Sequence, residues 1–166
     1  ASYLSENSTQ SQGGILDDRA GQIGGFGFPK EKITTNVSYN IDNWTVFLQG
    51  RWVGDGILDR TRMESNAAIP LTQRPAGSLL AACGTNICTI DNNKIPSTFY
   101  MDAKVTGRFG ENQNMEVFAN IQNLLNRDPI ITPGTGVGRT GTGTGVNSGL
   151  YDILGRRYTV GVNYEF

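Results

Sequence analysis

The chain has 166 residues, 14 of them basic and 15 acidic, and it contains no histidine. The clustered Lys and Arg of a phosphate-binding surface are absent, so no nucleic-acid partner is expected. Without histidine, no Ser-His or Cys-His nucleophile and no histidine metal ligand can form, so we expect neither an enzyme nor a cofactor.

Residues 1–28 show no alternation and are rich in polar residues and glycine, which predicts an exposed external loop. The pair Asp17 and Asp18 offers the oxygen ligands that calcium prefers. Adjacent carboxylates in a Gly-rich loop more often form a solvated turn, and the turn is the favoured interpretation.

Residues 29–54 alternate between apolar and polar side chains, which predicts a hairpin of two amphipathic strands. The less polar face takes the odd positions of 32–41, which are apolar except for Thr35, and the even positions of 44–52. The Asp-Asn pair between these runs, residues 42–43, has the composition of a tight turn.

Residues 55–96 form a long external loop that contains both cysteines of the chain. Cys83 and Cys88 lack the further ligands of a zinc site, and a local disulfide is favoured over two free thiols. Such a bridge indicates an oxidising compartment, and its short ring would stabilise the loop by only about 2 to 3 kcal/mol. Three arginines of this loop are candidates for contacts with an anionic ligand or lipopolysaccharide, although scattered arginines are usually solvated: Arg60, Arg62 and Arg74.

Residues 97–124 predict a second hairpin with a short turn at 110–114, and a Gly- and Thr-rich external loop follows at 125–156. Within that loop, GVGRTGTGTG at 136–145 superficially resembles phosphate-binding glycines. No lysine follows it and no helix is expected there, so a loop without a ligand is favoured.

Residues 157–166 predict a terminal strand in which every even position from 158 onward is apolar or aromatic. A final aromatic residue on the lipid face is the usual assembly signal of outer-membrane barrels. The residues of this signal are Tyr158, Val160, Val162, Tyr164 and Phe166.

The expected fold is all-β, an antiparallel transmembrane β-barrel segment, rather than a soluble antiparallel sheet with one buried face. Strand charges lie on the polar face, short turns alternate with long connections, and aromatics on the apolar face collect at two levels. No run of eighteen apolar residues is present, which excludes a transmembrane helix. Four basic residues should face the lumen, in contact with a plug or, as is favoured, in a charge network of the wall: Arg51, Lys104, Arg108 and Arg157.

Two motifs resemble the C-terminal barrel strands of TonB-dependent outer-membrane receptors. The motif that ends the penultimate strand in that family is matched by Asn123, Leu124, Asp128 and Pro129, whereas Leu125 and Asn126 replace its Phe-Asp. The Gly-Arg-x-Tyr/Phe motif and final Phe of the last strand are matched by Gly155, Arg156, Tyr158 and Phe166. The resemblance covers roughly residues 29–54 and 95–166.

The resemblance implies the last five strands of a barrel of about 22 strands in the bacterial outer membrane. It implies active uptake of a scarce nutrient: a ferric siderophore, cobalamin or an oligosaccharide. The implied partners are the rest of the barrel and its plug, a TonB-type energy-coupling protein, outer-membrane lipid and lipopolysaccharide, the barrel assembly machinery and a surface lipoprotein. The alternative is a structural or adhesive surface protein that displays its long loops and transports nothing.

Five strands leave two open sheet edges, and such edges in hydrocarbon leave backbone groups unsatisfied at a cost of several kcal/mol each. The missing strands are therefore expected upstream in a longer chain, in preference to other chains. The plug and the coupling box are not among these residues, and no feature here identifies the transported substrate.

Overall fold

The computed structural model describes residues 1–9, 17–24, 27–59, 63–64, 89–90, 92–132 and 145–165. Within these ranges the regular elements are all strands, and no helix occurs. Six strands form one antiparallel sheet in the order β1 (Ser2–Tyr3), β4 (Glu31–Ile41), β5 (Trp44–Val53), β10 (Thr98–Phe109), β11 (Met115–Gln122) and β12 (Arg157–Tyr164). The all-β, antiparallel prediction is confirmed, and the sheet is open because β1 and β12 do not pair with each other.

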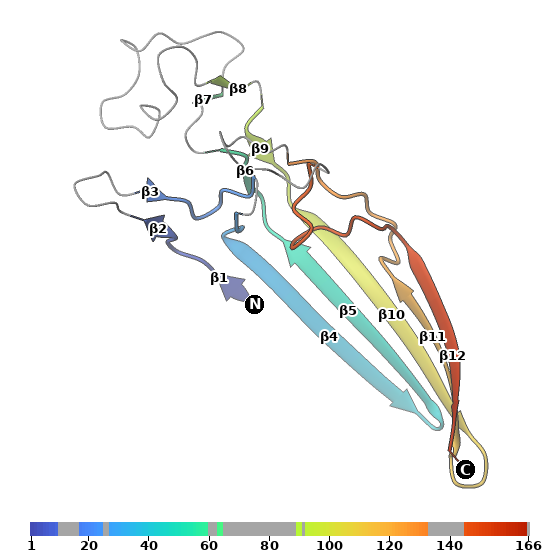
Figure 1. The fold of residues 1–166 in the computed structure, drawn as a ribbon. Helices are drawn as coiled ribbons and strands as arrows, with labels where there is room; N and C mark the ends of the chain where they lie inside the picture. The colour runs from blue at the N-terminus through green and yellow to red at the C-terminus, as the bar shows by residue number, and fades with distance from the viewer. Residues whose placement is uncertain are drawn as a thin grey trace, which may run out of the picture.

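Two hairpins build most of this sheet. Ile41 pairs with Trp44, so β4 and β5 are joined by a two-residue turn, in which Asp42 has a φ of 48°. Phe109 pairs with Met115 across the longer turn between β10 and β11. Both turns lie at one end of the sheet together with the end of β12, and the long connections lie at the other (Figure 1). We refer to these as the turn end and the loop end.

Among the described residues, three pairs of short strands lie at the loop end (Figure 1). β2 (Ser8–Thr9) pairs with β3 (Asp17–Asp18), and β6 (Gly56–Ile57) pairs with β9 (Lys94–Ile95), both antiparallel. β7 (Met63–Glu64) and β8 (Thr89–Ile90) form a parallel pair. Each of these strands has only two residues, which is too short for alternation to reveal it in the sequence.

The N-terminal segment differs from the exposed loop expected for residues 1–28. β1 joins the main sheet, because Ser2 pairs with Lys32 and Tyr3 with Glu31. Ala20 and Ile23 are buried under the loop-end connections. Residues 1–8 are almost all exposed, as expected, whereas residues 20–24 are buried. Composition reports local preference and could not predict this burial, which comes from residues distant in the sequence.

Two strand glycines make room for aromatic rings on neighbouring strands. Gly161 pairs with Phe118, and a Cβ at position 161 would lie 2.5 Å from the Phe118 ring. Gly107 pairs with Trp44, and a Cβ there would lie 2.8 Å from the Trp44 ring. A glycine in a strand is favourable where a neighbouring ring covers the exposed backbone, so these residues fix where the rings lie.

Candidate functional site

One face of the main sheet is apolar and exposed. The register places apolar residues of successive strands side by side, as in the row Val37, Leu48, Ala103, Ile121 and Tyr158. Val160 is 80% exposed, and no described segment of the chain covers the row in which it lies. A contiguous apolar surface of this kind marks an interface with another apolar phase or a partner.

Aromatic residues of this apolar face form two bands. The band nearer the loop end contains Trp52, Phe99 and Tyr158, and the band nearer the turn end contains Tyr39, Trp44, Phe109 and Tyr164. Trp52 pairs with Phe99, whereas Tyr158 lies two rows nearer the turns, level with Ala103. The second band also shifts towards the turn end from Tyr39 on β4 to Tyr164 on β12. Both bands therefore run obliquely to the rows of hydrogen-bonded residues.

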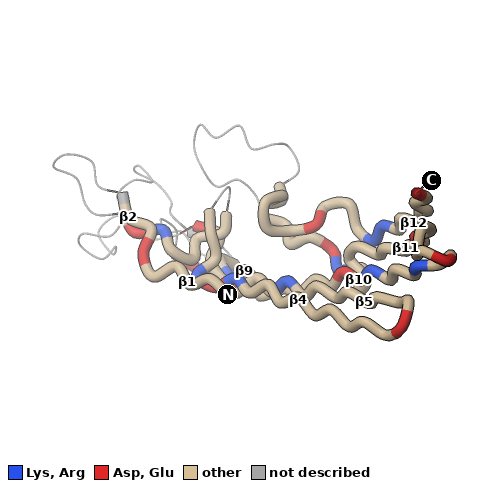
Figure 2. Tube along the Cα trace, turned by 90° about the horizontal axis from the view of Figure 1, so that it is seen from below, with Lys and Arg blue, Asp and Glu red and all other residues tan. Residues whose placement is uncertain are grey.

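The opposite face of the sheet is polar and carries the strand charges apart from Glu31, which begins β4. The charged residues of β4 and β5 lie near the loop end, and those of β10 to β12 are spread along the strands (Figure 2). Ion pairs in the described part of the chain include Arg51–Asp102 at 3.4 Å, Arg108–Glu116 at 3.2 Å and Arg157–Asp152 at 3.0 Å. Lys104 instead lies over the Phe118 ring, 5.0 Å from its centroid. Three of the four basic residues that were expected to face a lumen therefore each form an ion pair with a different acidic residue, and a network within a barrel wall stays a prediction.

A small hydrophobic cluster covers the polar face at the loop end. Tyr100 and Val53 belong to this face because they alternate with Phe99 and Trp52, and Tyr100 is 0% exposed. The cluster consists of Ile23, Val53, Leu58, Ile95, Tyr100 and Tyr151. Burial, and next the neighbouring Tyr100, raises the pKa of Tyr151 to about 12. The connections thus fold back over the polar face and leave the apolar face bare.

Three buried asparagines fasten the connections to this end of the sheet. The Asn93 side chain accepts from the amide of Asp59 and donates to its carbonyl, both at 2.9 Å. Asn123 forms the same pair of bonds with Arg127, again at 2.9 Å. Such bonds satisfy backbone groups that would otherwise be buried without partners. These hydrogen bonds therefore fix the two ends of a connection relative to each other, even where the connection is long.

The third asparagine, Asn147, joins the last connection to the N-terminal segment. Its side-chain amide donates to the carbonyl of Gly27 at 3.1 Å, and its side-chain oxygen accepts from the amide of Gly149 at 3.2 Å. A side chain at position 27 would overlap the carbonyl oxygen of Gln22, so only glycine fits there. This contact brings together residues that are 120 positions apart in the sequence.

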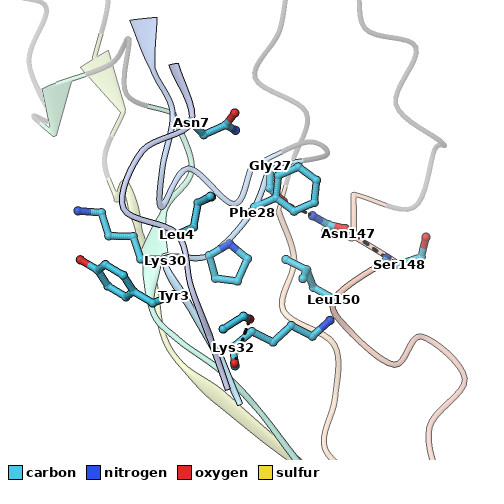
Figure 3. A pocket seen from close by; sticks show the side chains of 13 residues that line it. Tyr3, Leu4, Asn7, Gly27, Phe28, Lys30, Lys32, Asn147, Ser148 and Leu150 are labelled. Atoms are coloured by element: carbon cyan, nitrogen blue, oxygen red, sulfur yellow. Dashed lines mark hydrogen bonds between the residues drawn. The ribbon is translucent and has the colours of Figure 1, made fainter. Parts of the chain in front are cut away.

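A cavity of about 780 Å³ opens beside this contact at the loop end (Figure 3). Three segments line it: the strand β1 and the residues after it, the approach to β4, and the turn after Asn147. Lys32 extends past Leu150 on one side of the cavity, and Tyr3, Leu4 and Lys30 lie on the other (Figure 3).

Several residues expected to form sites lie outside the described part of the chain. They are Cys83, Cys88, Arg60, Arg62, Arg74 and Phe166, and the disulfide and the anion contacts therefore stay predictions. Most of the 136–145 segment also lies outside it. The other four residues of the expected assembly signal, Tyr158, Val160, Val162 and Tyr164, are exposed on β12.

Asp18 acts within its own loop. Asp17 and Asp18 form the short strand β3 rather than the expected turn, and the Asp18 carboxylate accepts hydrogen bonds from the backbone amides of Asn7 and Ala20, both at 3.0 Å. No group of three or more Cys, Asp or Glu side chains suited to a metal occurs in the described residues.

The sequence reasoning missed the cavity and the buried asparagines. Asn93 and Asn147 sit in polar loops, where asparagine is common, so composition gave no signal for either. Asn123 lies in a motif that the sequence did single out, but its role there follows from its contacts. The Gly-Phe-Pro run at 27–29, in which glycine and proline restrict the backbone in opposite ways, was the one available hint of a specific structure.

Comparisons with known proteins found no similar protein. The chain matches no protein-family model, no curated protein and no solved structure. Among the residues that the structure describes, no helix has the length and apolar character needed to cross a membrane.

Proposed function

We propose that the chain forms part of the wall of a TonB-dependent receptor barrel in the bacterial outer membrane, and that this receptor takes up a scarce nutrient. The observation that carries the proposal is the exposed apolar face, on which Val160 and Val162 have 80% and 64% of their surface uncovered. Hydrocarbon is the simplest phase that would cover a continuous face of valine and aromatic side chains.

The aromatic bands support the same proposal. Trp52 and Trp44 are eight residues apart on β5, and Phe99 and Phe109 are ten apart on β10. These separations correspond to roughly 26 to 33 Å along a strand, or about 20 to 25 Å across a membrane for strands tilted by about 40°. That thickness is close to the apolar band of outer-membrane barrels, about 25 Å. Strand tilt also accounts for the oblique course of both bands.

The open edges of the sheet also suit a barrel. β1 covers only the first two residues of β4, and β12 has one neighbour among the described strands. A strand that continued β1 in the same register would cover the rest of β4. Closure by further strands would satisfy the backbone groups of both edges, as hydrocarbon requires.

Paired arginine substitutions test the membrane face. Thr159 and Val160 are adjacent on β12, both are exposed, and their side chains point to opposite faces. An arginine on the lipid face near the midplane costs roughly 2 to 4 kcal/mol. We expect Val160→Arg to reduce the folded, heat-modifiable protein in outer-membrane fractions several-fold, and Thr159→Arg to stay within about twofold of the wild type.

In water both substitutions would add a charge to an exposed position and should be tolerated alike. Equal yields of folded protein from Val160→Arg and Thr159→Arg would therefore overturn the proposed membrane face.

Nutrient uptake separates a receptor from a display protein. We expect cells that lack this protein to lose uptake of a ferric siderophore, cobalamin or an oligosaccharide, and cells that lack the energy-coupling protein to lose the same uptake. Unchanged uptake of all three nutrients would favour the surface-display alternative.

A further inference from the structure

The cavity beside Asn147 has the size and preorganisation of a small-molecule site. Its volume, about 780 Å³, falls in the usual range for such sites. The amide of Leu4 donates to the carbonyl of Lys30 at 2.7 Å, and the Asn147–Gly27 bond fixes the third wall. The lining is therefore held by these two hydrogen bonds before any ligand arrives, which lowers the entropic cost of binding.

The lining combines an apolar floor with positive charge. Leu4, Phe28, Pro29 and Leu150 supply apolar surface, and Phe28 is 57% exposed. Two lysines and no acidic residue belong to the lining. Lys32 forms no ion pair in the described part of the chain. Glu31 is its neighbour in sequence, but alternation along β4 directs it to the opposite face.

We propose that this cavity binds a small carboxylate with a flat apolar body, such as an aryl carboxylate. The ring lies against Phe28, Pro29 and Leu150, and the carboxylate accepts a charge-assisted hydrogen bond from Lys32. The proposal deepens the proposed function and rests on it, since Lys32 lies on the polar face, which the proposed function assigns to the lumen. A sugar would leave the apolar floor unmatched, and a cationic ligand would be repelled by the lysines.

Equilibrium binding to the full-length protein in lipid nanodiscs tests this proposal. The probes are 2-naphthoate and its neutral analogue 2-naphthalenemethanol, titrated by calorimetry against empty nanodiscs as the blank. A charge-assisted hydrogen bond corresponds to about a tenfold difference in affinity or more, so we expect 2-naphthoate to bind at least tenfold tighter than the alcohol.

Two matched lysine variants identify the charge that matters. We expect Lys32→Gln to remove the preference for 2-naphthoate and Lys94→Gln to leave it within about twofold. Lys94 is an exposed lysine at the same end of the sheet that lines a different cavity, whereas Lys30 lines both. Both variants change exposed side chains, and folding is checked by heat-modifiability.

Three results would each overturn the proposal: no binding of 2-naphthoate, equal affinity for both probes, or an unchanged preference in Lys32→Gln. These results leave the membrane face untouched, because binding is measured without transport. Conversely, equal tolerance of Thr159→Arg and Val160→Arg would overturn the membrane face without affecting the binding measurement.

Discussion

Asn123 combines an unusual backbone conformation with a complete set of hydrogen bonds. Its φ is 52°, in the left-handed region that asparagine tolerates better than most residues. Its side chain forms hydrogen bonds with the backbone amide and the carbonyl of Arg127. Its backbone amide donates a hydrogen bond to the Asp102 carboxylate at 2.8 Å. Because Asp102 also pairs with Arg51, Asn123 connects the end of β11 to an ion pair on the polar face.

Substitutions at Asn123 should separate the backbone cost from the hydrogen-bond cost. Asn123→Gly keeps the conformation and loses two side-chain bonds, each worth about 0.5 to 1.5 kcal/mol. Asn123→Ala loses the same bonds and adds about 1 to 2 kcal/mol for a left-handed alanine. We expect the free energy of unfolding in urea to fall in the order wild type, Asn123→Gly, Asn123→Ala. Equal stability of the glycine and alanine variants would show that the backbone conformation carries no cost.

At the scale of elements, the loop-end cluster couples the connections to the strands. Tyr151 lies in the last connection and Tyr100 on β10, and both are buried in the same cluster. A phenol buried there is costly to ionise, so the cluster requires Tyr151 to stay protonated.

Alkaline titration should therefore loosen the loop end. The pKa of Tyr151 is raised from 10.0 to about 12, so between these values the unfolded chain releases a proton that the folded chain retains. The stabilisation is full below about pH 10 and is lost as the pH rises towards 12. We expect protease cleavage of the connections to increase over this range, and Tyr151→Phe to reduce the increase. Tyr158→Phe, at an exposed tyrosine, is the control, and an equal effect of both variants would contradict the assignment.

The strands could be predicted from the sequence because each one repeats a simple local rule. Apolar and polar residues alternate along most of β4 and β10, and an Asp-Asn pair marks the turn at 42–43. The loop-end structure could not be predicted in this way. Asn147 contacts Gly27 across 120 residues, and no local pattern specifies that contact. The short pairing of β1 with β4 was missed for the same reason.

At the scale of the whole molecule, the sheet has one bare face and two incompletely paired edges. The outer edge of β4 at residues 33–41 and the outer edge of β12 have no partner strand in the described part of the chain (Figure 1). The polar face, by contrast, is covered at the loop end by the hydrophobic cluster. This asymmetry fits a segment of a closed wall with the connections folded inward.

Hydrogen exchange on the intact protein in a membrane tests closure. If further strands complete the barrel, we expect the amides of β4 and β12 to be as strongly protected as those of β5 and β10, which have partners on both sides. Rapid exchange confined to β4 and β12 would mean that the edges stay open and would contradict the barrel.

The bare apolar face also matters on the way to the bilayer. A chain that exposes so many valine and aromatic side chains is prone to aggregate in any aqueous compartment that it crosses. If the sheet is part of a membrane barrel, a chaperone must cover its apolar face until the chain reaches the membrane. β12 contains Val160, the most exposed valine among the described residues, so we expect such a chaperone to bind β12.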